Sequence, residues 1–202
     1  MGIIKNYSNS EVIEPPNEIV ALEERFVFHR PITLVIGAKL FTFTEDDYTI
    51  KDDEGMDYFK CSGNSLNISN KKIIYDLYDL PLLNIKNQIL SLRDKVTVYL
   101  GETEEEVFAT VTQKSMVNVT KYTLDFFNQA KDKKEFLDLK CDIVGNSCGV
   151  FYGKEKEGAP MIGKITRKIE SSTYSYTVEI APKVDIALMV AATICFDQLK
   201  KE

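Results

Sequence analysis

Tryptophan is absent from the sequence, histidine occurs once, and the common short motifs of catalysis are missing. The single histidine, His29, stands beside Arg30 and Pro31 and far from any serine or cysteine motif, so no hydrolytic triad is indicated. Phosphate-binding glycine loops and the GxSxG and HExxH patterns do not occur either. We therefore rank an enzyme last among the function classes and expect His29 to be a surface or partly packed side chain.

The sequence does not have the residue patterns typical of metal sites or disulfide frameworks. The chain contains four cysteines: Cys61, Cys141, Cys148 and Cys195. They lack CxxC spacing, so neither a disulfide framework nor a zinc site is expected, and reduced thiols in the cytosol fit the pattern better. The acidic runs 52–54 and 104–106 fall in expected turns, where solvated charge is the ordinary role. We expect no metal ion and no cofactor.

Positive charge is in deficit, with 25 Lys and Arg against 31 Asp and Glu and a net charge of -6. This balance excludes a general attraction to nucleic acid or to an anionic membrane, so such contact would need a local basic patch. The amino-terminal region has no apolar stretch of the secretory type. The expectation is a cytoplasmic protein without a nucleic-acid partner, with a peripheral membrane location and a nuclear location left open.

One stretch, 184–200, is apolar on every side and predicts a helix. Ala, Leu and Met favour helix, and neither Gly nor Pro interrupts the run. A surface helix would show one apolar stripe, whereas Ile186, Met189, Val190 and Ile194 point in different directions, so the helix needs partners all round. Its uncharged part, Ile186 to Phe196, is shorter than the roughly 20 residues that a membrane span requires. We expect a buried core helix and no transmembrane segment.

The rest of the chain shows the residue pattern of strands separated by turns. Polar and apolar residues alternate most clearly in Leu137–Ile143 and Tyr174–Ile180, which indicates strands with one buried face. Further strands are expected at 32–36, 40–43, 48–51, 56–61, 72–77, 82–90, 96–100, 107–113 and 116–127. Many short strands with hairpin links favour an antiparallel sheet closed on itself. The fold class is therefore mainly β: a closed antiparallel barrel around the buried C-terminal helix.

The domain organisation is simple. Residues 1–17 are polar with two adjacent prolines and read as a loosely attached arm, and residues 18–202 form one domain. The segment 18–30 fits a helix or a strand equally well, and both readings stay open. Residues 128–135 are expected to be a polar, lysine-rich loop.

Four stretches in this order resemble the LURP-one-related family, part of the tubby C-terminal-like superfamily that includes phospholipid scramblases. They are Tyr48–Gly55, Ile73–Leu82, Met161–Lys168 and Tyr176–Ala187. The resemblance spans about residues 20–202 and implies a barrel of twelve strands around the last helix. The chain departs from the family pattern where tryptophan is frequent, near Val96, and where glycine precedes Pro81. The calcium-linked acidic segment of the scramblases has no clear counterpart here.

The resemblance also raises lipid headgroups as ligands, because tubby domains bind phosphoinositides through basic side chains. The candidates here are Lys71, Lys72, Lys164, Arg167 and Lys168, with Lys114 and Lys121 as further possibilities. The simpler alternative is that these residues lie on the solvent-exposed face of strands and have no ligand. We rank first a non-catalytic interaction or regulatory module of LURP-one-related type that contacts anionic phospholipid headgroups. A scramblase-like lipid-handling protein is the second hypothesis, and the protein partner is unknown.

Overall fold

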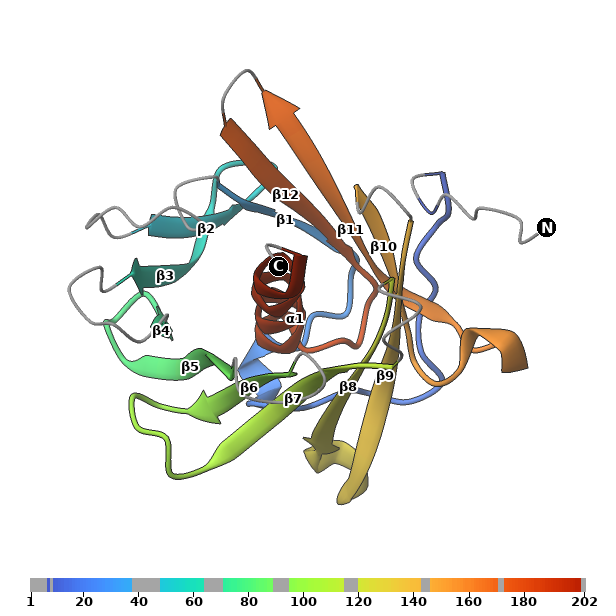
Figure 1. Ribbon diagram of the computed structural model, residues 1–202, viewed down its shortest axis with the longest axis horizontal. Helices are drawn as coiled ribbons and strands as arrows, with labels where there is room; N and C mark the ends of the chain where they lie inside the picture. Colours follow the sequence, from blue (N-terminus) through green and yellow to red (C-terminus); the bar gives the residue numbers. More distant parts are fainter. Residues whose placement is uncertain are drawn as a thin grey trace.

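In the described part of the chain, twelve antiparallel strands close into one barrel, and a long helix runs through its middle (Figure 1). The structure is a computed structural model that describes residues 7, 9–37, 48–63, 71–88, 95–114, 120–142, 146–170 and 173–200. Every strand pairs with the next one along the chain, and β1 closes the barrel on β12, where Ile32 lies opposite Ile180. The predicted fold class is confirmed.

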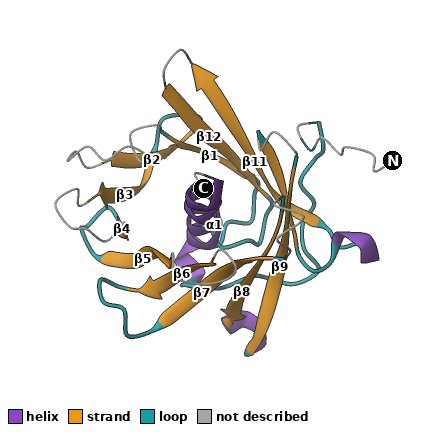
Figure 2. Cartoon of the chain, viewed as in Figure 1, coloured by secondary structure: helices purple, strands orange, loops and turns teal. Residues whose placement is uncertain are grey.

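The elements follow the chain in a simple order (Figure 2). The strands are β1 (Ile32–Ile36), β2 (Tyr48–Asp52), β3 (Asp57–Gly63), β4 (Lys71–Tyr75), β5 (Pro81–Gln88), β6 (Lys95–Leu100), β7 (Val107–Gln113), β8 (Lys121–Asn128), β9 (Lys133–Cys141), β10 (Ser147–Phe151), β11 (Met161–Glu170) and β12 (Thr173–Ile180). The helices within the described residues are α1 (Ile186–Lys200) and the short 3-10 turns η1 (Glu24–Phe26), η3 (Gln129–Lys131) and η4 (Glu155–Glu157).

Most expected strands appear with shifted ends. The polar loop expected at 128–135 is shorter than predicted, because β8 continues to Asn128 and β9 already begins at Lys133. The segment 18–30 forms neither a long helix nor a sheet strand, but one 3-10 turn and two isolated bridges to Val184 and Asp185, the two residues just before α1. The strand predicted at 40–43 lies outside the described residues.

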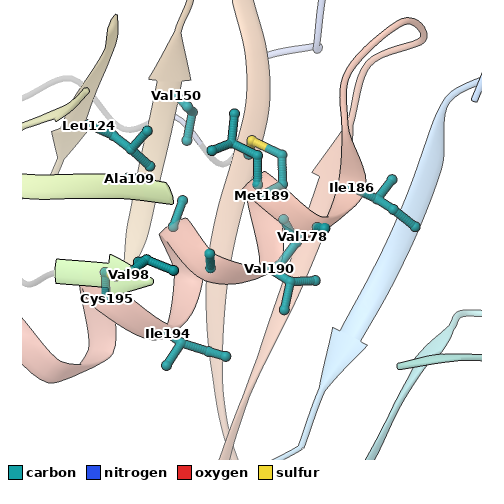
Figure 3. Packing of buried hydrophobic residues seen from close by; sticks show 14 of the residues in the cluster. Val98, Ala109, Leu124, Val150, Val178, Ile186, Met189, Val190, Ile194 and Cys195 are labelled. Atoms are coloured by element: carbon teal, nitrogen blue, oxygen red, sulfur yellow. The ribbon is translucent and has the colours of Figure 1, made fainter. Parts of the chain in front are cut away.

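Helix α1 fills the barrel. Its side chains from Ile186 to Leu199 are all buried, and they pack on inward-facing residues of the surrounding strands. Figure 3 shows Met189 and Cys195 among wall residues such as Val98 and Val150. Gly163 on β11 allows the closest approach, since a Cβ there would collide with the end of the Met189 side chain. Close packing of this kind explains why a helix apolar on every side is stable in this barrel.

The amino-terminal end of α1 is capped by Asp185, which is fully buried. One carboxylate oxygen accepts hydrogen bonds from the N–H groups of Ala187 and Leu188, at 2.9 and 3.3 Å. The other accepts from the N–H groups of Ala21 and Leu22, at 3.0 and 2.7 Å. The same residue therefore caps the helix and holds the segment that closes this end of the barrel.

The expectation that all four thiols are reduced is wrong for one pair. Cys141 on β9 and Cys148 on β10 lie directly opposite each other in the antiparallel ladder and form a disulfide. Cys61 and Cys195 are buried and take no part in the disulfide. Sequence spacing did not reveal the pair, because the two cysteines are seven positions apart in the sequence and only the hairpin register brings them together.

The segment before residue 18 lies along the outside of β10 and β11, at the right of Figure 1. Tyr7 is buried against Phe151 and Met161, and its hydroxyl donates to Glu155 at 3.1 Å. Gly149 makes room for it, because a Cβ there would lie 3.0 Å from the Tyr7 ring. Ile13 adds a backbone hydrogen bond to the carbonyl of Met161 at 2.7 Å.

Candidate functional site

The five basic candidates lie on two strands that are far apart around the barrel. Lys71 and Lys72 belong to β4, whereas Lys164, Arg167 and Lys168 belong to β11. On the shorter way round, β3, β2, β1 and β12 separate the two groups. The structure therefore does not gather these residues into one patch.

Alternation along each strand also divides the candidates between two faces. Lys71, Lys164 and Lys168 are on the outer face of the barrel, because Ile74 and Ile165 point into the core. Lys72 shares the inward face with Ile74, and Arg167 shares it with Ile165. A flat membrane surface could contact only outward residues, and it would meet those of β4 or those of β11 but not both groups.

Lys164 points outward but is buried by contacts with other parts of the chain. It is only 7% exposed, its ammonium group lies 2.9 Å from Glu179, and it donates to the carbonyl of Ser10 at 3.1 Å. Lys164 thus ties the segment before residue 18 to the wall. Lys168, four residues further along β11 and on the same face, is exposed.

Arg167 belongs to a polar cluster near the carboxyl end of α1. Its guanidinium lies 4.1 Å from the centre of the Tyr174 ring, and its Nε is buried without a hydrogen-bond partner in the described structure. The hydroxyl of the neighbouring Tyr176 donates to Asp197 at 3.0 Å. Burial, together with the Asp197 carboxylate, raises the pKa of both tyrosines well above the ordinary value. The cluster supports the wall–helix contact, and Asp197 was not singled out from the sequence.

A row of lysines crosses the outer face of neighbouring strands. Lys121 on β8 is opposite Lys140 on β9, which is opposite Gly149 on β10, which is opposite Lys164 on β11. Asp138, itself buried, forms ion pairs with Lys140 and Lys114. Burial raises the pKa of Asp138, but the two lysines outweigh burial and hold that pKa below its usual value. Much of this positive charge is therefore neutralised within the chain.

A second basic group lies on the outer face of β4 and β5. Lys71 is directly opposite Lys86 in the antiparallel ladder. The ammonium group of Lys86 lies 2.8 Å from both carboxylate oxygens of Glu104, and that of Lys71 donates to the carbonyl of Glu102 at 2.7 Å. The partners come from the acidic loop between β6 and β7. Lys86 is a basic neighbour that the sequence reading missed.

The sole histidine has the environment of a surface residue. Its side chain is 75% exposed, and its Nδ1 lies 3.8 Å from the Glu18 carboxylate. Within the described residues, no group of three or more His, Cys, Asp or Glu side chains is arranged to hold a metal ion. In the same part of the chain, no helix combines the length and the apolar character needed to cross a membrane.

Comparison with known proteins gives one consistent result. A family model described as LURP-one-related matches residues 32–197. Protein LURP-one-related 10 of Arabidopsis thaliana is 28% identical over 178 residues, which cover 85% of this chain and 92% of that protein. Protein LURP-one-related 15 of the same plant is 23% identical, covering 91% of this chain and 87% of that protein. An X-ray structure of an Arabidopsis protein shares the fold, with a TM-score of 0.63, 20% identity, and coverage of 90% of this chain and 98% of that one.

Proposed function

The chain belongs to the LURP-one-related family, and we propose that it is a non-catalytic interaction or regulatory module that contacts anionic phospholipid headgroups through lysines on the outside of the barrel. The observation that supports this most is the filled interior. Helix α1 occupies the space that other barrels of this size offer to a ligand, and its side chains from Ile186 to Leu199 are all buried. Recognition is therefore assigned to the outer surface and the loops.

The outward lysines differ in how available they are. Lys164 is buried and paired with Glu179, so its main role is to hold the chain together. Lys168 is exposed and Lys71 is half-buried, and both are on the outer face. These two residues are the better contacts for a phosphate-bearing headgroup, because ammonium groups on a rigid sheet form charge-assisted hydrogen bonds with phosphate oxygens.

Co-sedimentation with liposomes tests the proposal. The full chain is mixed with neutral vesicles or with vesicles that contain phosphatidylinositol bisphosphate, at low and at physiological salt. We expect binding only to the phosphoinositide vesicles, weaker at higher salt. Because four strands separate Lys71 from Lys168, a vesicle surface should use one of them, so either Lys71→Gln or Lys168→Gln should reduce binding. Lys134→Gln, an equal loss of charge at an exposed position on β9, should change binding little.

The contrary result is equally informative. If wild-type protein fails to sediment with phosphoinositide vesicles even at low salt, the lipid part of the proposal is wrong. Equal losses for all three lysine variants would mean that only net charge matters, and would contradict a contact through Lys71 or Lys168.

A further inference from the structure

Two lysines face each other across β4 and β5. Lys71 and Lys86 are register partners, and both point outward because Ile74 and Ile85 point into the core. Like charges directly opposite each other in a sheet are destabilising. The pair therefore needs a counter-anion, and the chain provides one.

The counter-anion comes from the loop 101–106, which follows β6 and contacts Lys71 on β4 and Asn84 on β5. The Glu104 carboxylate binds Lys86 through both oxygens at 2.8 Å. The amide of Asn84, fully buried two positions before Lys86 on β5, donates to the carbonyls of Glu102 and Thr103 at 3.2 and 3.3 Å. The loop thus places one carboxylate and two carbonyl oxygens over a surface of donors.

Thr97 on β6 extends this surface by one strand. It is the register partner of Lys86, it is 3% exposed, and its hydroxyl forms no hydrogen bond within the described structure. Lys71, Lys86, the Asn84 amide and the Thr97 hydroxyl can all donate hydrogen bonds. A cluster of donors that includes two ammonium groups suits the oxygens of a phosphate better than a single carboxylate.

Backbone hydrogen bonds hold the two ends of the loop: the N–H of Gly101 donates to the carbonyl of Leu82 and the N–H of Leu100 donates to the carbonyl of Glu106, both at 2.8 Å. Residues 102–106 are all exposed, so no buried apolar side chain anchors them. Four of the five are glutamates, which repel one another. A phosphomonoester carries about -1.5 to -2 charges at neutral pH, against -1 for Glu104, so it competes favourably for the lysine pair.

We propose that the outer face formed by Lys71, Asn84, Lys86 and Thr97 is a phosphate-binding site that the loop 101–106 keeps closed, with Glu104 as the built-in occupant. A phosphomonoester displaces Glu104 and opens the loop. This rests on the proposed function, since it names where an anionic headgroup binds and what competes with it. A phosphoinositide headgroup and a soluble inositol phosphate present the same chemistry.

The two sources are separated by two probes, inositol hexakisphosphate in solution and vesicles that contain phosphatidylinositol bisphosphate. Glu104→Gln removes the competing charge and should raise the affinity for inositol hexakisphosphate about fivefold, as expected for loss of an exposed ion pair. Glu105→Gln removes the same charge from the same loop and is the matched control, with a much smaller effect expected. Lys86→Gln added to Glu104→Gln should abolish the gain. Thermal unfolding of each variant establishes that it is folded.

The outcomes are distinct. Equal effects of Glu104→Gln and Glu105→Gln on the affinity would contradict the role of Glu104 as the built-in occupant, because the affinity would then depend on net charge alone. Binding of inositol hexakisphosphate that Lys86→Gln and Lys71→Gln leave unchanged would overturn the site. If Glu104→Gln strengthens binding of the soluble probe but neither it nor the wild type binds vesicles, the phosphate site stands and the lipid function fails. If vesicles bind through Lys168 and not through Lys71 or Lys86, the lipid function stands and this site fails.

Discussion

The carboxylate of Asp185 accepts a hydrogen bond from the backbone N–H of Leu22 at 2.7 Å, although 163 positions separate the two residues. The same carboxylate caps α1 through Ala187 and Leu188. One buried side chain therefore joins the core helix to the segment that closes the barrel end, and both parts depend on it.

Two substitutions of Asp185 distinguish its role as the helix cap from its role in holding Ala21 and Leu22. Asp185→Ala should lower the free energy of unfolding by about 2–4 kcal/mol, because it removes a helix cap and leaves the buried N–H of Ala21 and the half-buried N–H of Leu22 without this acceptor. Asp185→Ser keeps an oxygen able to cap α1 but is too short to reach Ala21 and Leu22 as well, so it should recover about 1 kcal/mol of the loss. Urea denaturation measures both values. Equal stability of Asp185→Ala and wild type would contradict the linking role.

The buried helix makes a second prediction. Ile194→Asp places a charge at a fully buried position and should lower the free energy of unfolding by at least about 4 kcal/mol, a large part of a typical total of 5–15 kcal/mol. Ile169→Asp is the matched control, since Ile169 on β11 is 62% exposed and the same change should cost less than about 1 kcal/mol. Circular dichroism during thermal unfolding compares them. A fully stable Ile194→Asp protein would refute the packing of α1.

Sequence patterns predicted the features that repeat along the chain. Alternation identified β9 and β12, and the absence of a polar face identified α1 as the core. In contrast, β10 was not predicted. All five of its residues are buried, and its outer face is covered by Tyr7, so it has no polar–apolar alternation.

The candidate site was only partly visible for a related reason. Lys71 was named from the sequence, and the acidic run after Gly101 was read as solvated turn charge. Their contact depends on the register that sets Lys71 opposite Lys86 and on the return of the loop over the sheet. Neither the register nor the path of a polar loop can be read from local composition. Lys164 illustrates the converse, since nothing local shows that Glu179 and Ser10 cover it.

Glu135 gives a prediction about pH. Burial opposes its ionisation, but hydrogen bonds from Tyr152, Asn128 and Lys133 outweigh burial and lower the pKa of Glu135 to about 2, from an ordinary 4.5. A carboxyl group with a lowered pKa in the folded state stabilises the protein above its unfolded pKa, and this contribution is lost as the pH falls from about 4.5 to 2. Glu135→Gln should therefore lower the free energy of unfolding by about 1–3 kcal/mol at pH 7.

The difference between Glu135→Gln and wild type should shrink as the pH approaches 2, because the wild-type carboxyl group becomes neutral as well. Urea denaturation at a series of pH values measures it. Glu54→Gln, an exposed glutamate in the turn between β2 and β3, serves as the control and should change stability little at any pH. A constant difference between Glu135→Gln and wild type from pH 7 to pH 2 would contradict the ionised, hydrogen-bonded Glu135.

The disulfide makes the last prediction. Under denaturing conditions without reductant, thiol titration should find two reduced thiols, those of Cys61 and Cys195, and reduction should raise the number to four. Because the link closes a short loop, loss of chain entropy in the unfolded state limits its effect on the free energy of unfolding to about 2–2.5 kcal/mol. Reductant should lower the stability of wild type by up to that amount and leave a Cys141→Ser/Cys148→Ser protein unchanged. Four free thiols in the unreduced protein would mean that the two strands are held only by their ladder and that the β9–β10 hairpin needs no covalent link.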